Sequence, residues 1–257
     1  CALPIWSFDM GKEVDRARQI SGGRGAVGIN IMVAMQHYGE YVKEAIRQKV
    51  DFIVSGAGLP MDLPELLKGT GVKKIPVVSS VKAARVICRR WWSKYTALPD
   101  AVVVEGPLAG GHLGFDGETA KEAAREAAAD GGMAKKTDPE TKRFGLRQSF
   151  DEEIRRIVTF LREWGQEHGR YIPVITAGGL RTHEDLVHQQ ELGADGIQVA
   201  SRFVTTRECD ADIRFKQAYV DCRREDIVIV KSPVGMPGRA IRNRFIEKSA
   251  EGRIPPR

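Results

Sequence analysis

The sequence predicts an α/β fold built on a parallel sheet, and two observations lead to this class. Six apolar segments recur near residues 28, 53, 77, 103, 174 and 199, and helical patterns follow them. Gly-rich loops follow several of these strands, as in barrels, where such loops share one rim. A TIM (β/α)8 barrel has eight strands. Six β–α units therefore fit either an open doubly wound sheet or a TIM-type barrel that lacks its first two strands.

The first half of the chain supplies four of the strands. Met10–Ile20 has a mildly amphipathic helical pattern, which Ser21-Gly22-Gly23 ends. Asn30 is a polar residue within the first strand, where a buried amide either braces the sheet or faces a ligand. Trp91 and Trp92 are expected to pack against the sheet. We expect strands at 26–33, 52–58, 75–80 and 101–105, and helices at 38–49, 64–68 and 82–92.

The second half begins with a segment that breaks this alternation. Residues 116–149 are rich in Glu, Lys, Ala and Gly, and we expect a surface insertion containing a helix at 120–129. The pattern then resumes, and Thr182 with Asp185 forms a capping-box signal for the next helix. We expect helices at 150–168 and 211–222, strands at 172–177 and 196–203, a short extended run at 227–230 and a constrained loop at 232–238.

The segment 101–115 is the most informative part of the chain. Its buried strand leads into a loop with four glycines and one histidine, His112. Glycines let the backbone approach a flat or phosphorylated ligand closely. A histidine at the carboxyl end of a buried strand lies where α/β proteins place their chemistry. A Gly-rich turn with a solvated histidine explains this segment equally well.

The composition limits the function classes. The chain has 257 residues and 42% hydrophobic content, enough for one large α/β domain or two small ones. The net charge of +6 comes from 40 basic and 34 acidic residues. Basic residues are scattered and do not alternate with aromatic residues, so we expect no nucleic-acid partner. A modest positive charge suits an anionic cofactor or substrate, although solubility explains it too.

The cysteines and the hydropathy pattern indicate in which cellular compartment the protein is expected. Cys1, Cys88, Cys209 and Cys222 form no CxxC pair and no zinc spacing, so we expect no metal site and a reducing compartment. No apolar run approaches the roughly 20 residues of a membrane span. We therefore expect a cytoplasmic protein with no membrane contact.

Two consecutive strand ends indicate a phosphate site. Gly178 and Gly179 precede the helix start at Thr182, and this arrangement presents backbone N–H groups to an anion. Ala200 and Ser201 end the next strand and add N–H groups and a hydroxyl. In TIM barrels the loops after the last two strands commonly bind phosphate. His112 must lie on the same rim as Gly178 and Gly179 if these loops serve one site.

Five motifs in order resemble the nitronate monooxygenase family, formerly called 2-nitropropane dioxygenase, which includes FMN-dependent enoyl-acyl-carrier-protein reductases. They are Gly28-Ile-Asn-Ile-Met-Val33, Val54-Ser-Gly-Ala-Gly58, Glu105-Gly-Pro-Leu-Ala-Gly-Gly-His-Leu-Gly114, Ala177-Gly-Gly179 and Gln198-Val-Ala-Ser201. The resemblance runs from about Gly28 to Phe245, and it implies a TIM barrel that binds FMN. Two strands of that family precede the Gly-x-Asn strand. The resemblance thus implies a single FMN-binding barrel domain over 1–257, truncated at its N-terminus.

The resemblance also assigns site residues. His112 matches the active-site histidine, which would act as an acid or base at the flavin face. The residues that match cofactor-binding positions are Asn30, Glu105, Gly110, Gly111, Gly178, Gly179, Gln198, Val199, Ala200 and Ser201. Glu105 departs from the Gln of many members. A carboxylate there would disfavour an anionic reduced flavin unless it were protonated or turned away.

Three functions follow as hypotheses. The first is an FMN-dependent nitronate monooxygenase that oxidises alkyl nitronates with molecular oxygen. The second keeps FMN but takes hydride from NAD(P)H and reduces an enoyl thioester. The third is an inactive barrel fragment. Its open sheet edge could pair with a second copy, so a homodimer is one of the expected states.

Overall fold

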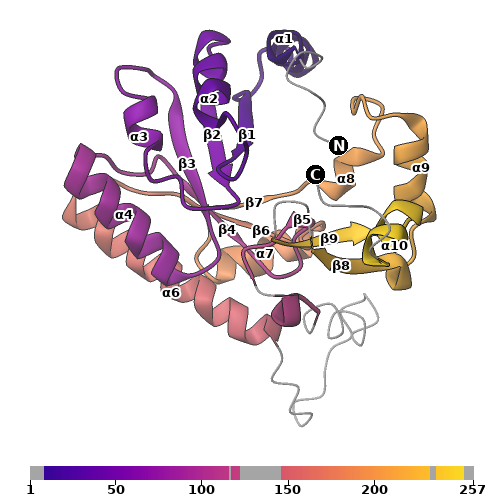
Figure 1. Cartoon of the computed structure of the whole chain (residues 1–257). Coiled ribbons are helices and arrows are strands. Elements are labelled where there is room, and N and C mark those ends of the chain that lie inside the picture. The colour runs from indigo at the N-terminus through magenta and orange to yellow at the C-terminus, as the bar shows by residue number, and fades with distance from the viewer. Residues whose placement is uncertain (1–8, 116, 122–145, 232–235, 252–257) are drawn as a thin grey trace.

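A six-stranded parallel sheet forms the centre of the computed structural model, which describes residues 9–115, 117–121, 146–231 and 236–251 (Figure 1). Each strand lies beside the one before it, as in a barrel. The sheet bends into a half-barrel whose two ends are β1 and β7. The predicted α/β class with six β–α units is confirmed. The strands are β1 (Gly28–Met32), β2 (Phe52–Gly56), β3 (Lys73–Val78), β4 (Val102–Glu105), β6 (Val174–Ala177) and β7 (Gly196–Gln198).

Helices cover the outer face of the sheet, and the main hydrophobic core lies between them and the strands. Ile53 and Val104 of the strands are buried there with Val42, Ile87 and Ile157 of the helices. Figure 1 shows α4 and α6 side by side along this face. No helix in the described parts of the chain is long and apolar enough to cross a membrane. The helices before β7 are α1 (Met10–Ser21), α2 (Tyr38–Arg47), α3 (Leu63–Leu66), α4 (Val81–Tyr95), α6 (Leu146–Glu167) and α7 (His183–Glu191).

The inner face carries a smaller cluster that includes Val54, Ile75 and Val103. Because side chains alternate along a strand, Asn30 faces the same side as Val54, its partner in the β1–β2 register. The expectation that Asn30 is buried is wrong, since its side chain is exposed. The reason is its position on β1, which ends the sheet and, within the described part of the chain, has a neighbouring strand on one side.

The C-terminal part forms a second, antiparallel sheet in the order β5-β9-β8. The expectation of a loop at 232–238 is wrong at its C-terminal end, because Pro237 and Gly238 begin β9. Residues 232–235 lie outside the described residues. The strand expected at 196–203 is also too long, because Ser201 starts a helix. The elements are β5 (Gly111–His112), α8 (Ser201–Val204), α9 (Ile213–Asp221), η2 (Arg224–Asp226), β8 (Ile227–Lys231), β9 (Pro237–Ile241) and α10 (Arg244–Ala250).

Local signals for helix ends are confirmed. Gly22 ends α1 in the left-handed region with φ of 59°, and its N–H donates to the carbonyls of Arg18 and Gln19. Thr182 and Asp185 form the expected capping box at the start of α7.

Two other expectations need correction or fall outside the description. Trp91 is fully buried and donates from Nε1 to the Pro60 carbonyl at 3.0 Å, whereas Trp92 lies at the surface, against the ring of His168. The structure describes the expected helix at 120–129 only as far as residue 121. Residues 117–121 are helical. The rest of that helix, and most of the 116–149 insertion, lies outside the described residues.

Candidate functional site

Glu105 lies at the carboxyl end of β4, on the inner face of the half-barrel. It is opposite Ala177 of β6, which in turn is opposite Gln198 of β7, so these three positions form one row across the sheet. Burial raises the pKa of the Glu105 carboxyl to about 7. The group can therefore gain or lose a proton near neutral pH.

The loop after β4 packs directly against the loop after β6. The Gly106 N–H donates to the Ala177 carbonyl at 2.8 Å. A Cβ on Gly178 would lie 2.9 Å from the Gly106 carbonyl oxygen, and one on Gly179 would lie 2.8 Å from Cβ of Leu108. Both glycines have positive φ, 102° and 78°. The structure thus brings together the Gly-rich loop that leads to His112 and the paired glycines, as expected.

His112 ends this loop in the two-residue strand β5, where it lies opposite Gly238 of β9. The residue is half-buried. Its Nε2 atom is buried and has no hydrogen-bond partner among the described residues. A buried polar atom without a partner costs free energy, and such atoms are therefore uncommon unless a ligand or water satisfies them. Gly110 and Gly111 beside it are exposed, with nothing within 4 Å of a Cβ added to either.

The segment after β7 supplies the other expected residues. Gln198 and Val199 are half-buried, whereas Ala200 and Ser201 are exposed at the start of α8. The start of α7 is less open than the sequence suggests. Asp185 accepts from the backbone N–H groups of Arg181 and Thr182 at 2.8 and 3.0 Å. These two N–H groups just before α7 are therefore already bonded and not free to bind an anion.

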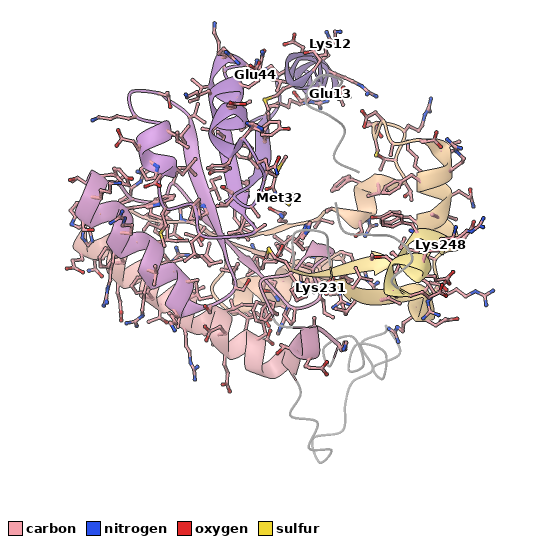
Figure 2. All side chains as sticks on the ribbon, viewed as in Figure 1. Lys12, Glu13, Met32, Glu44, Lys231 and Lys248 are labelled. Atoms are coloured by element: carbon pink, nitrogen blue, oxygen red, sulfur yellow. The ribbon has the colours of Figure 1, made fainter. Side chains whose placement is uncertain are left out.

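Asn30 stands apart from these loops in the order of the sheet. It lies in the middle of β1, whereas Glu105 and Gln198 end β4 and β7 on the other side of β2 and β3. Met32 ends β1 and is labelled in Figure 2. In a closed barrel β1 would come round toward β7; the half-barrel leaves Asn30 exposed instead.

Sequence reasoning missed Arg239. Its guanidinium donates from Nε to the Ala109 carbonyl at 3.0 Å, and from Nη2 to the carbonyls of Pro107 at 2.8 Å and Ala120 at 3.3 Å. Burial lowers the pKa of this guanidinium. The signal in the sequence was the Pro237-Gly238-Arg239 run after an extended segment, but its partner is distant in sequence.

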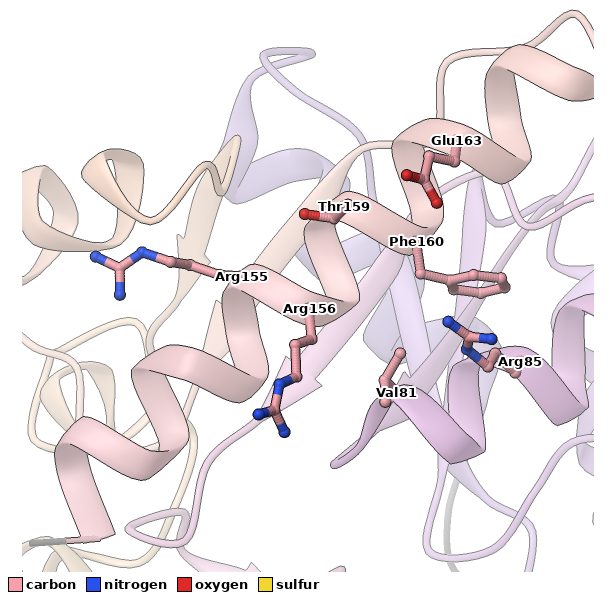
Figure 3. A pocket seen from close by; sticks show the side chains of 7 residues that line it. All are labelled: Val81, Arg85, Arg155, Arg156, Thr159, Phe160 and Glu163. Carbon is pink, nitrogen blue, oxygen red and sulfur yellow. The ribbon is translucent and has the colours of Figure 1, made fainter.

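A separate groove of about 320 Å³ lies on the outer surface between α4 and α6 (Figure 3). Its lining includes Arg85, which lies over the Phe160 ring at 5.0 Å. Figure 2 shows charged side chains projecting outward along these helices. The groove is lined by helix residues, and none of the glycines of the candidate site borders it. Arg85 is itself exposed, as on a solvated helix face.

Comparison with known proteins identifies the family. The model of the nitronate monooxygenase family matches residues 8–256. The chain belongs to the nitronate monooxygenase family. It is 27% identical over 221 residues to a probable nitronate monooxygenase of Staphylococcus saprophyticus, which covers 86% of this chain and 52% of that protein.

Solved structures agree with this family. FabK from Thermotoga maritima has 27% identity and a TM-score of 0.66, over 95% of this chain and 62% of that one. Nitroalkane oxidase from Streptomyces ansochromogenes, at 20% identity and a TM-score of 0.60 over 94% of this chain and 68% of that one, shares the fold. The chain therefore spans between half and two thirds of the length of the nitronate monooxygenase relative and of FabK.

Proposed function

We propose that this chain binds FMN and oxidises alkyl nitronates with molecular oxygen. Membership of the nitronate monooxygenase family, whose members typically depend on FMN, supports the reaction class. The observation that carries the assignment of the site is the packing of two glycine-rich loops, one of which leads to His112, whose buried Nε2 has no hydrogen-bond partner among the described residues.

The described residues fit a phosphorylated flat cofactor. Gly178 and Gly179 would face the phosphate with Val199, Ala200 and Ser201, because backbone N–H groups and a hydroxyl suit an anion. Gly110 and Gly111 leave space for a flat ring. Glu105 and Gln198 would border the ring from the inner face, and Asn30 would reach it only if the barrel closes. Glu105 is compatible with a flavin chiefly in its neutral form, which its raised pKa favours below about pH 7.

The chemistry divides between cofactor and protein. Bound FMN would supply the redox step, in which two electrons leave the substrate and pass to oxygen. His112 would hold or move a proton at Nε2. In its protonated form the imidazole would stabilise the charged nitro oxygens of a nitronate, and in its neutral form it would accept a proton from the carbon next to a nitro group.

Replacement of His112 tests this assignment. His112→Ala should still take up FMN, measured by visible absorbance after gel filtration, but turnover of an alkyl nitronate should fall roughly 100-fold to 10,000-fold. The control is His183→Ala, since His183 is exposed on α7. Unchanged turnover in His112→Ala would refute the role of this histidine.

Similarity to FabK supports a second candidate, an NAD(P)H-dependent flavin reductase of enoyl thioesters. The two reactions differ in what reduces the flavin. Under anaerobic conditions, bleaching of the flavin band by NAD(P)H would favour the reductase. Bleaching by a nitronate but not by NAD(P)H would favour the monooxygenase.

The open half-barrel supports a third candidate, an inactive chain whose sheet does not close around a cofactor. β1 and β7 do not pair with each other, so their outer edges could pair with another copy. A purified chain that stays colourless with added FMN would support this candidate. Sedimentation would then show whether two copies associate.

A further inference from the structure

The short strand β5 depends on a distant part of the chain. Gly111 lies opposite Arg239 and His112 opposite Gly238, and the Leu113 N–H donates to the Pro237 carbonyl at 2.9 Å. A strand of two residues is not stable alone. Its backbone position is therefore set by β9, which β8 supports on the other side.

The loop between β4 and β5 has one turn hydrogen bond of its own, from the Ala109 N–H to the Gly106 carbonyl at 3.1 Å. Its last residue, Gly110, and the first residue of β5, Gly111, carry no side chains, and Gly111 has φ of 76°. Such residues lose the most conformational freedom on folding, so this loop needs contacts from outside. Gly178 supplies backbone packing against Gly106 and Ala109 from the β6 side.

Arg239 supplies contacts from the other side. Its Nε and Nη2 atoms donate to Ala109 and Pro107, which are inside the loop, and Nη2 also reaches Ala120, which lies beyond β5. One rigid guanidinium thus joins carbonyls on both sides of His112. Arginine suits this role because its planar group presents several donors in a fixed arrangement.

Burial of the Arg239 guanidinium costs free energy. Removal of a guanidinium from water is unfavourable unless strong acceptors replace the solvent. Here the acceptors are backbone carbonyls, and burial lowers the pKa of the group. A guanidinium at the surface would avoid this free-energy cost. The placement of Arg239 therefore indicates that its hydrogen bonds serve the local structure.

We propose that Arg239 is a positioning residue that holds the loop 106–111 in place and thereby sets the position of the His112 imidazole. Its importance for catalysis rests on the function proposed above, whereas its effect on the loop does not. The competing explanation is that Arg239 merely anchors the β8–β9 hairpin and stabilises the whole fold.

Two substitutions and one control separate these explanations. Arg239→Met keeps much of the apolar stem but removes all three hydrogen bonds. Arg239→Lys keeps the charge with a single donor group. Arg242→Met is the control, because Arg242 is exposed in the same region and its backbone N–H, which the substitution keeps, donates to the Asp226 carbonyl at 2.6 Å.

The first measurement is hydrogen exchange of peptides that cover 106–115, compared with peptides that cover β2. Arg239→Met should speed exchange in the loop at least about tenfold and leave β2 unchanged, because the opening is local. Arg239→Lys should lie between the wild type and Arg239→Met. Arg242→Met should match the wild type.

The second measurement is the NMR chemical shift of the His112 ring protons at one fixed pH, with His183 as the internal reference. Loss of Arg239 should move the His112 ring signals and leave those of His183 in place. Unchanged loop exchange with unchanged His112 signals would overturn the inference. Equal acceleration in the loop and in β2 would also overturn it, in favour of a general anchor. A loosened loop in an enzyme whose His112→Ala variant is fully active would uphold the inference and refute the proposed function.

Discussion

Glu105 lies opposite Ala177 in the register of β4 and β6, so its carboxyl shares the inner face with an apolar neighbour. Such surroundings disfavour the ionised form. Burial on this face is the reason why a residue at the rim of the sheet has a pKa of about 7 instead of 4.5. The first two predictions depend on it.

The stability of the fold should fall as Glu105 ionises. A folded-state pKa above the unfolded value means that stability is full below about pH 4.5 and is lost as pH rises through 7. The loss corresponds to about 3 kcal/mol. Glu105→Gln should lack this loss, so it should be more stable than the wild type at pH 8. Urea unfolding at pH 5 and pH 8 measures this, with exposed Glu65→Gln as the control. A wild type with equal stability at both values would contradict the prediction.

Binding of FMN should show the same dependence. An ionised Glu105 would repel the anionic cofactor, whereas the neutral acid would not. The FMN dissociation constant of the wild type should therefore rise as pH passes 7, and that of Glu105→Gln should rise less. Flavin fluorescence titrations from pH 5.5 to 8.5 would measure both. Parallel curves for the two proteins would exclude this role for Glu105, and absence of binding in both would instead count against the flavin site.

Gly178→Ala should destabilise the protein more than Gly23→Ala. Both residues have positive φ, so each substitution strains the backbone by roughly 1 to 2 kcal/mol. Gly23 has nothing within 4 Å of an added Cβ, whereas the Cβ of Gly178→Ala would meet Gly106 backbone atoms at 2.9 and 3.0 Å. Overpacking adds about 1 to 3 kcal/mol. The difference in unfolding free energy between the variants measures the contact between the two loops, and equal values would mean that the loops separate freely.

Asp100→Asn should lower stability by about 2 to 3 kcal/mol at pH 7. The carboxyl is 7% exposed and accepts from the backbone N–H and the Nζ of Lys74, both at 2.9 Å, and from Arg170. Burial opposes ionisation, but these hydrogen bonds outweigh it and hold the pKa below 3.8.

The lowered pKa of Asp100 determines how its contribution to stability changes as pH falls. Asp100 contributes stability above about pH 3.8, and that contribution is lost as pH falls through the folded-state pKa. The gap between wild type and Asp100→Asn should therefore narrow in acid. Urea unfolding at pH 7 and pH 3 would measure it. Asp210→Asn, which breaks an exposed pair with Arg16, should change stability by less than about 1 kcal/mol.

Several features of the fold follow from short-range patterns. The apolar strands predict the parallel sheet because burial on both faces requires continuous hydrophobic segments. Gly22 and the Thr182–Asp185 capping box predict helix ends because these signals act within one turn. The strand after Gly196 was predicted too long, since Val199-Ala200-Ser201 suits a strand equally well until α8 begins.

The candidate site was predicted in part for the same reason. Carboxyl ends of parallel strands meet at one edge, so the meeting of the His112 loop with Gly178 and Gly179 could be expected from order alone. The exposure of Asn30 could not be predicted from the sequence, because it depends on whether a further strand lies beside β1. The β5–β9 pairing could not either, because its register joins segments far apart in the sequence.

The sequence by itself determined the α/β class, the family resemblance and the residues of the two glycine loops, because these depend on local pattern and motif. The tertiary structure alone decided the rest. Arg239 contacts Ala109 across 130 positions of sequence, and burial of Glu105 depends on β6 and β7. Such contacts follow from how strands pack in space, and no local pattern encodes them.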